Sequence, residues 1–182
     1  MKRTLFQDLV LSLLILAAVP AAAITHNFQS MQGAGKLSNV GSVYTSADDG
    51  IVYTLGGTAD IYWDYAHRSG GTGAKICLNL LANGAYAIVS PALSHLSEVV
   101  VNYTINKVSD WDDYVTVYLS TDGSDWASIT PSLSYTSGRI VVTPPSLGAY
   151  YIKIACIKSA QLSITQITYT FSDCNCFTYT PE

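Results

Sequence analysis

The chain has 182 residues and a formal net charge of −4, and 49% of its residues are hydrophobic whereas only 12% are charged. This length suits one domain with a sizeable core. Lys and Arg form no cluster, which argues against nucleic acid as a partner, because its phosphates require concentrated positive charge. Many Ser, Thr and Tyr residues and few charges are typical of exported β proteins, in which neutral polar side chains cover the outer faces of strands.

The first 23 residues have the pattern of a secretory signal peptide. A basic pair at residues 2–3 precedes an apolar run at residues 9–19, and Ala21 and Ala23 occupy the small-residue positions of a cleavage site. The apolar run is too short to span a bilayer, which needs roughly 20 residues. We therefore expect residues 24–182 to form a single exported domain, extracellular or periplasmic, with no membrane span after cleavage.

Period-two alternation of apolar and polar residues predicts strands along the rest of the chain. Turn residues recur about every 8–12 residues, which favours an all-β, jelly-roll-like sandwich of two mostly antiparallel sheets. Asn83-Gly84 is the dipeptide that most strongly predicts a tight hairpin. Strands are expected at residues 51–55, 59–65, 75–81, 85–90, 99–105, 113–120, 139–143, 149–157 and 161–171, and an irregular loop is expected at residues 31–42.

Residues 115–126, VTVYLSTDGSDW, combine a strand pattern with turn residues. Val115, Val117 and Leu119 alternate with polar or amphipathic residues and are predicted to face the core. Asp122-Gly123 predicts a hairpin turn. A short strand is expected around Trp126, whose side chain is expected to close over the edge of the sandwich.

The predicted strand at residues 161–171 contains a change of phase. Leu162 and Ile164 share one parity, whereas Ile167 and the aromatic residues at 169 and 171 share the other. A β-bulge near Thr165-Gln166 would keep all five apolar side chains on the core face.

Four cysteines follow the predicted signal peptide, and an even count in an exported chain permits disulfides. Three connectivities are open, of which we favour a bridge between Cys77 and Cys156, because both lie in strand-like runs. Cys174 and Cys176 are poorly placed to bridge each other across one residue, and they lie in a short tail that begins at about residue 172. The spacing does not indicate a zinc site.

Residues 61–71, IYWDYAHRSGG, bring aromatic rings together with charged groups. Sugar recognition needs this mixture, because rings pack on apolar C–H faces while planar charged groups fix the hydroxyls. Trp63 and Tyr65 share a parity with Ile61 and are expected to be core residues. The candidate ligand-binding residues are Tyr62, Asp64, His67 and Arg68.

Residues 110–113, DWDD, are the densest charge cluster. Asp110, Asp112 and Asp113 could supply oxygen ligands to a structural Ca²⁺. The alternative is a solvated loop with an Asx turn, since EF-hand spacing is absent. No other cofactor is expected.

The sequence does not predict a catalytic centre, so we do not expect an enzyme. Adjacency of Ser94 and His95 does not place a hydroxyl against an imidazole, and no GxSxG motif occurs. The three histidines, His26, His67 and His95, have no metal-binding spacing.

The order of motifs between residues 85 and 171 resembles bacterial surface jelly rolls of the cleaved-adhesin and choice-of-anchor-J type, within the galactose-binding-like class. Residues 85–96, AYAIVSPALSHL, resemble the opening strand of these domains with its Ser-Pro and Leu. Residues 112–126, DDYVTVYLSTDGSDW, resemble their Asp-Asp-Tyr, strand, Ser-Thr-Asp-Gly and Trp segment. Residues 149–157 and 161–171 resemble their closing strand pair.

The resemblance implies a secreted, non-catalytic binding module of the kind found in Bacteroidetes-like bacteria. Carbohydrate is the implied ligand class, so that the partner would be a glycan or a cell-surface protein, and a structural calcium is frequent in such domains. Two alternatives stay open. One is a structural or adhesive surface protein that binds other proteins, and the other is an accessory domain of a larger secreted hydrolase.

Overall fold

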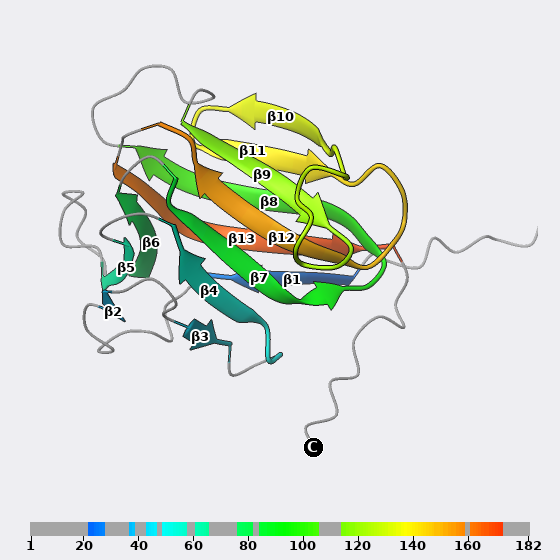
Figure 1. Ribbon diagram of the computed structural model, residues 1–182, viewed down its shortest axis with the longest axis horizontal. Helices are drawn as coiled ribbons and strands as arrows, with labels where there is room; N and C mark the ends of the chain where they lie inside the picture. Colours follow the sequence, from blue (N-terminus) through cyan, green and yellow to red (C-terminus); the bar gives the residue numbers. More distant parts are fainter. Residues whose placement is uncertain are drawn as a thin grey trace, which may run out of the picture.

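A computed structural model of the chain describes residues 22–27, 37–38, 43–46, 49–57, 61–65, 76–81, 84–105, 114–158 and 161–172. For residues 37–38, 44, 61–65, 76–81, 105 and 161–163 it describes the backbone alone. This part of the chain is all-β, with two antiparallel sheets packed face to face, and it confirms the predicted sandwich (Figure 1). The jelly-roll strand order stays a prediction. The described segments include no helix that is long and apolar enough to cross a membrane.

The thirteen strands of the described segments divide into two sheets. Sheet A consists of β1 (Ala22–His26), β2 (Leu37–Ser38), β5 (Ile61–Tyr65), β6 (Ile76–Leu81), β8 (Leu96–Ile105), β10 (Ser132–Thr136), β11 (Arg139–Thr143) and β13 (Gln161–Phe171). Sheet B consists of β3 (Val43–Thr45), β4 (Val52–Gly56), β7 (Tyr86–Leu93), β9 (Val115–Ser120) and β12 (Tyr150–Cys156).

In sheet A the strands lie in the order β10-β11-β8-β13-β6-β5-β2, and β1 also pairs with β13. Sheet B has the order β3-β4-β7-β12-β9 and lies in front of sheet A in Figure 1. The nine long predicted strands are present, and β13 has the predicted bounds. Strands β1, β2, β3 and β10 were not predicted; β2 lies within the expected loop at residues 31–42, and the predicted cleavage site falls inside β1.

Two predicted hairpins are wrong, because the chain crosses between the sheets at both turns. The connection that contains Asn83-Gly84 leads from β6 in sheet A to β7 in sheet B. The Asp122-Gly123 turn leads from β9 in sheet B toward β10 in sheet A. No strand forms around Trp126, and the β9–β10 connection contains only an isolated bridge between Leu119 and Ile129. Such turn dipeptides therefore do not determine which sheet the next strand joins.

A contact between two segments that connect the sheets shows how tertiary structure determines which sheet a strand joins. A Cβ atom on Gly57 would overlap the carbonyl oxygen of Gly84, so the backbones of these two glycines pack directly against each other. Gly57 also has a φ of 106°, which favours glycine. The end of β4 is therefore in contact with the chain just before β7.

The predicted bulge in β13 is confirmed. Its register on β8 shifts between Ile164 and Gln166, so that Thr165 is the extra residue. The Thr165 hydroxyl donates to the carbonyl oxygen of Asn102, at 3.2 Å, and the Asn102 amide donates to Gln166 Oε1, at 2.7 Å. The buried apolar side chains on both sides of the bulge are Ile164, Ile167, Tyr169 and Phe171.

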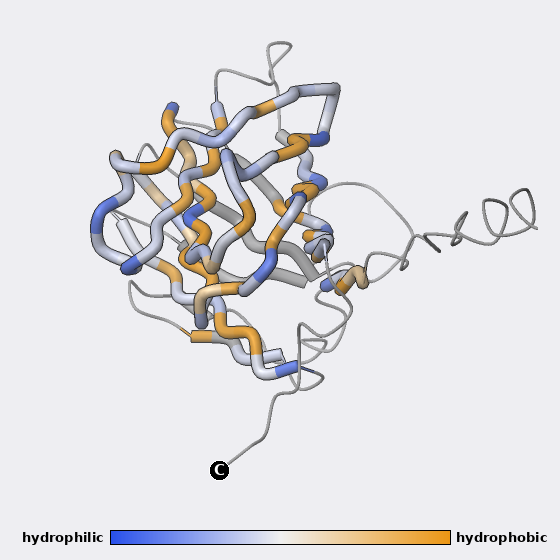
Figure 2. Tube along the Cα trace, turned by 90° about the vertical axis from the view of Figure 1, so that its right-hand side faces the viewer, coloured by the Kyte–Doolittle hydropathy of each residue, from blue (hydrophilic) through white to orange (hydrophobic). Residues whose placement is uncertain are grey.

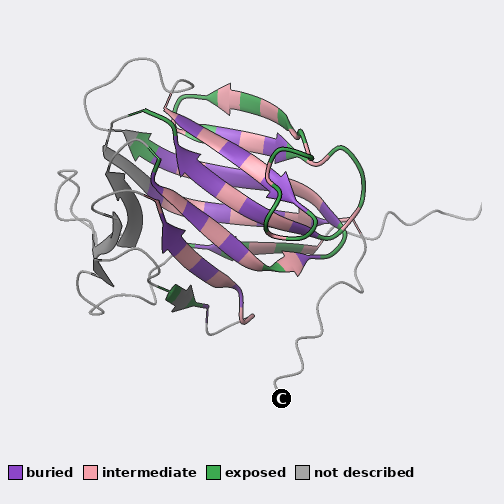
Figure 3. Cartoon of the chain, in the orientation of Figure 1, coloured by how far each residue is buried: buried purple, intermediate pink, exposed green. Residues whose placement is uncertain are grey.

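The core lies between the sheets and follows the period of two. Hydrophobic and polar residues alternate along the strands (Figure 2), and buried residues alternate with half-buried ones on sheet B (Figure 3). Val115, Val117 and Leu119 are buried, as predicted. Outward side chains of sheet B are therefore available to form a surface.

Candidate functional site

The four predicted ligand-binding residues lie in or beyond β5 of sheet A. Tyr62 and Asp64 pair through their backbones with Asn79 and Cys77 of β6, and their side chains are not among those described. His67 and Arg68 lie outside the described residues. Their role in binding stays a prediction.

The predicted calcium ligands Asp110, Asp112 and Asp113 also lie outside the described residues. Within the described segments no group of three or more His, Cys, Asp or Glu side chains could hold a metal ion. Cys156 is buried, with its Sγ 2.9 Å from the carbonyl oxygen of Lys158. Since the side chain of Cys77 is not described, the bridge between these cysteines stays a prediction.

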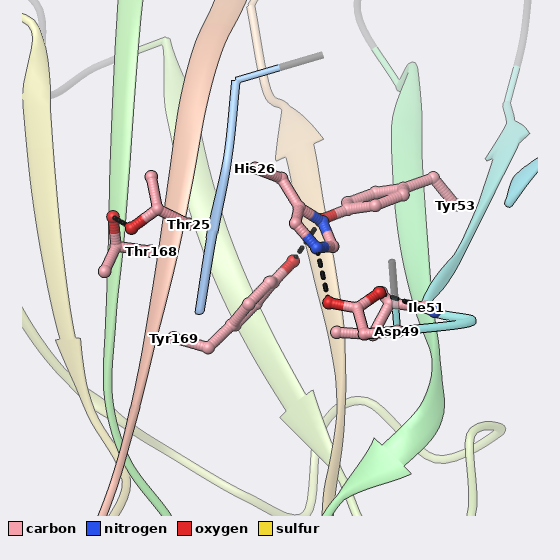
Figure 4. A network of polar contacts seen from close by, with 7 residues as sticks. All are labelled: Thr25, His26, Asp49, Ile51, Tyr53, Thr168 and Tyr169. Carbon is pink, nitrogen blue, oxygen red and sulfur yellow. Dashed lines mark hydrogen bonds and ion pairs between the residues drawn. The ribbon is translucent and has the colours of Figure 1, made fainter. Parts of the chain in front are cut away.

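Four polar side chains form a buried network between the sheets (Figure 4). His26 of β1 has its Nδ1 2.5 Å from the Tyr53 hydroxyl of β4, and that hydroxyl lies 2.8 Å from the hydroxyl of Tyr169 in β13. The other ring nitrogen, Nε2, lies 2.7 Å from Asp49 Oδ2. A carboxylate there accepts the Nε2 hydrogen. Its second oxygen accepts the backbone N–H of Ile51, at 3.1 Å.

The network is enclosed, which indicates a structural role. Both tyrosines have no exposed surface and His26 is 8% exposed. Burial raises the pKa of Tyr169 well above its ordinary value, although the hydrogen bond with Tyr53 opposes the shift. The network therefore fastens β1 and β13 of sheet A to β4 of sheet B through hydrogen bonds.

A second cluster lies on the outer face of sheet B, where three aromatic rings surround one lysine. Lys153 of β12 places its Nζ 5.0 Å from the ring centroid of Tyr118, 4.8 Å from that of Trp126 and 5.4 Å from that of Tyr86. All four residues are half-buried. We call this surface the Lys153 face; it consists of Tyr86, Tyr118, Trp126 and Lys153.

Strand pairing explains how the Lys153 face forms. Lys153 lies directly opposite Tyr118 of the neighbouring strand β9, so their side chains point to the same side of the sheet. Tyr86 of β7 stands outward too, and its ring lies where a Cβ of Gly56 would otherwise be. The glycine in β4 thus leaves room for the tyrosine to lie flat against the sheet.

The connection after β9 brings Trp126 back over the same face. Asp122 Oδ1 accepts three hydrogen bonds, from the Ser120 hydroxyl at 2.8 Å and from the backbone N–H groups of Ser124 and Asp125 at 2.8 and 2.9 Å. The backbone bonds from Asp125 and Ser124 hold the pKa of Asp122 well below its usual range. Asp125 Oδ1 accepts the N–H of Ala127, at 3.0 Å. These bonds shape the turn that positions the indole.

A cation between aromatic rings is held by the negative faces of the rings. Partial burial lowers the pKa of Lys153, because the ammonium loses part of its contact with water. The same rings and ammonium together can contact a flat ligand that has apolar C–H faces and polar edges.

Sequence reasoning missed both clusters. The signal for the Lys153 face was visible in part, since YLSTDGSDW has aromatic residues on both sides of a turn. The lysine, which is thirty-five residues further along in β12 than Tyr118, could not be assigned to it without the strand pairing. The chain matches no protein-family model and no curated protein sequence.

Proposed function

We propose that the protein is an exported, non-catalytic binding module whose ligand is carbohydrate and whose contact surface is the Lys153 face. The observation that supports this best is the meeting of Tyr118, from a strand, and Trp126, from a loop, on one lysine at the outer surface. Half-exposed rings provide area for the C–H face of a sugar, while the ammonium donates hydrogen bonds to its oxygens.

The motif resemblance supports the same proposal. Residues 112–126, which resemble the jelly rolls of bacterial surface proteins, end at Trp126, one of the residues of the Lys153 face. Tyr62, Asp64, His67 and Arg68 are proposed to form a separate, second contact region on sheet A. The jelly-roll strand order and export through the signal peptide belong to this proposal.

A glycan array covering plant, host and microbial glycans tests the proposal, with wild type compared with Trp126→Ala. We expect wild type to bind and the variant to lose most of that binding, because the indole is part of the contact surface. Ile157→Ala is the matched control, since Ile157 is a hydrophobic residue that is 40% exposed but is not part of the Lys153 face. It follows the C-terminal end of β12. Absence of binding to every glycan, or equal binding by both variants, contradicts the proposal.

The array is repeated with Ca²⁺ and with a chelator, because the predicted ligands Asp110, Asp112 and Asp113 lie in the segment before β9. If calcium orders that loop, chelation lowers the melting temperature. A melting temperature that stays the same after chelation contradicts the calcium prediction alone and leaves the proposed contact surface standing.

One observation favours the alternative of a structural or adhesive protein. Val43 in β3 is 53% exposed, and β3 is one of the two outermost described strands of sheet B. An apolar side chain on an edge strand could pair with another protein. In that case Val43→Lys would abolish binding to the partner protein and Trp126→Ala would leave it unchanged.

A further inference from the structure

We infer that the ligand of the Lys153 face is an acidic saccharide, a sugar that carries a carboxylate, and that this carboxylate binds the Lys153 ammonium. The inference rests on the proposed function and adds the chemical class of the ligand.

The first observation is the isolation of the lysine. Lys153 is the only charged residue in the five strands of sheet B, whose sequences are VYT, VYTLG, YAIVSPAL, VTVYLS and YYIKIAC. Its cross-strand neighbours are Tyr118 on one side and Ile88 on the other, and neither offers a negative charge. A cation on this face thus has no counter-ion from its own sheet.

The loop above the face does not supply one either. Among the described residues the only ion pair joins His26 and Asp49, inside the sandwich. The carboxylates of Asp122 and Asp125 accept hydrogen bonds from the backbone of their own turn. Neither carboxylate forms an ion pair with Lys153 in the described part of the chain, and the ammonium faces three rings.

An unpaired, partly dehydrated cation favours an anionic ligand. The rings stabilise the ammonium, but they cannot replace a charge-assisted hydrogen bond to a carboxylate. The chain as a whole has a formal net charge of −4, so its overall field does not attract anions. Attraction of an anion must therefore come from Lys153 itself and acts only over a short distance. The negative charge of the ligand therefore has to lie next to the Lys153 ammonium.

The aromatic rings beside Lys153 favour a sugar as the part of the ligand that carries the carboxylate. Tyr118 and Trp126 lie at similar distances from the ammonium, 5.0 and 4.8 Å, so a group bound to Nζ is next to both rings. In a uronic acid the carboxylate is attached directly to the pyranose ring, whose C–H face can then stack on an aromatic side chain. An acidic peptide has a flexible chain between its carboxylate and its backbone, and lacks this rigid apolar face.

Three probes, one anionic and two neutral, test the inference by calorimetry on the full chain: an oligogalacturonate, its methyl ester and a neutral galacto-oligosaccharide. We expect the oligogalacturonate to bind about tenfold more tightly than its ester, the difference expected of one charge-assisted hydrogen bond. Added salt should weaken binding of the acid and leave binding of the ester nearly unchanged.

Lys153→Met should remove the preference for the acid, because methionine keeps an unbranched side chain against the rings and removes the charge. Lys158→Met is the matched control: Lys158 also lies over a ring, that of Tyr114, with its Nζ 5.4 Å from the centroid, but it is exposed beyond the end of β12. This control should keep the wild-type preference. Lys153→Arg should retain a preference, since the positive charge remains.

The outcomes separate the two proposals. Binding of the ester and the neutral sugar as tightly as the acid overturns the inference and leaves the proposed carbohydrate binding intact. Failure of all three probes on this chain, together with an empty glycan array, overturns both. Binding of poly-glutamate as tightly as the oligogalacturonate overturns the inference too, because charge alone would then explain it.

Discussion

Tyr169 shows how a single buried residue can couple stability to pH. Its hydroxyl is fully enclosed and bonded to that of Tyr53, and burial raises its pKa above the ordinary value. A raised pKa in the folded state means that, above about pH 10, the unfolded chain releases this proton while the folded chain keeps it. Tyr169 therefore stabilises the fold fully below pH 10, and this contribution is lost as the pH rises further.

The expected loss for one such group is about 1.4 kcal/mol per pH unit above pH 10. Urea unfolding at a series of pH values from 8 to about 11.5 measures it. Tyr169→Phe should be less stable at pH 8 but should show a shallower decline above pH 10. Parallel declines in the two proteins would contradict the assignment of this pH dependence to Tyr169.

The buried network also shows what could not be predicted at the residue scale. His26 is 23 residues from Asp49 and 27 residues from Tyr53 in the sequence. Tyr53 and Tyr169 are 116 residues apart. Each residue type is unremarkable in its own segment. Only the packing of β1, β4 and β13 brings them together, so no local pattern in the sequence indicates the network.

At the scale of the element, β13 shows how far a pattern can predict structure. Its bounds and its bulge were both predicted, because the change of phase at Thr165 has to be absorbed if the apolar residues on both sides are to stay in the core. The hairpins at Asn83-Gly84 and Asp122-Gly123 were wrong for a related reason. Face orientation is encoded in the alternation of a strand, whereas the choice of sheet depends on contacts that are distant in sequence.

Deleting Thr165 tests the importance of the bulge. The deletion would remove the extra residue and join Ile164 directly to Gln166, so that Ile167 and Tyr169 would stay on the core face in an unbroken alternation. We expect the deletion variant to keep its cooperative unfolding transition, as measured by circular dichroism during urea or thermal denaturation. Thr165→Ala keeps the backbone and loses one hydrogen bond to Asn102, so it should cost only about 1 kcal/mol. Loss of the cooperative transition in the deletion variant would show that the fold needs the bulge itself and not only the alternation on both sides of it.

At the scale of the whole molecule, the first and last described strands close the sandwich. Ala22 of β1 pairs with Phe171 of β13, and the pairing continues to His26 and Ile167. This pairing occupies the edge of β13 that β6 leaves uncovered, since β6 pairs only with residues 161–164. The ends of the described chain, which lie together in Figure 1, therefore hold sheet A together and link it to sheet B through His26.

Removing β1 should consequently destabilise the protein as a whole. A chain that lacks residues 1–27 loses the ladder to β13 and both hydrogen bonds of His26, which leaves Asp49 and Tyr53 without these partners. We expect its free energy of unfolding to fall by at least about 2 kcal/mol relative to a chain that lacks only residues 1–21 and retains β1. Urea denaturation of the two chains measures the difference.

His26→Ala separates the side chain from the strand. This variant keeps the backbone ladder of β1 and loses only the polar network, so its stability should lie between those of the two shortened chains. If it is as unstable as the chain without β1, the polar network accounts for the whole stabilising effect of β1. The backbone ladder then contributes nothing to the free energy of unfolding. If all three chains are equally stable, β1 is not part of the cooperative fold, and the sandwich closes through its other strands.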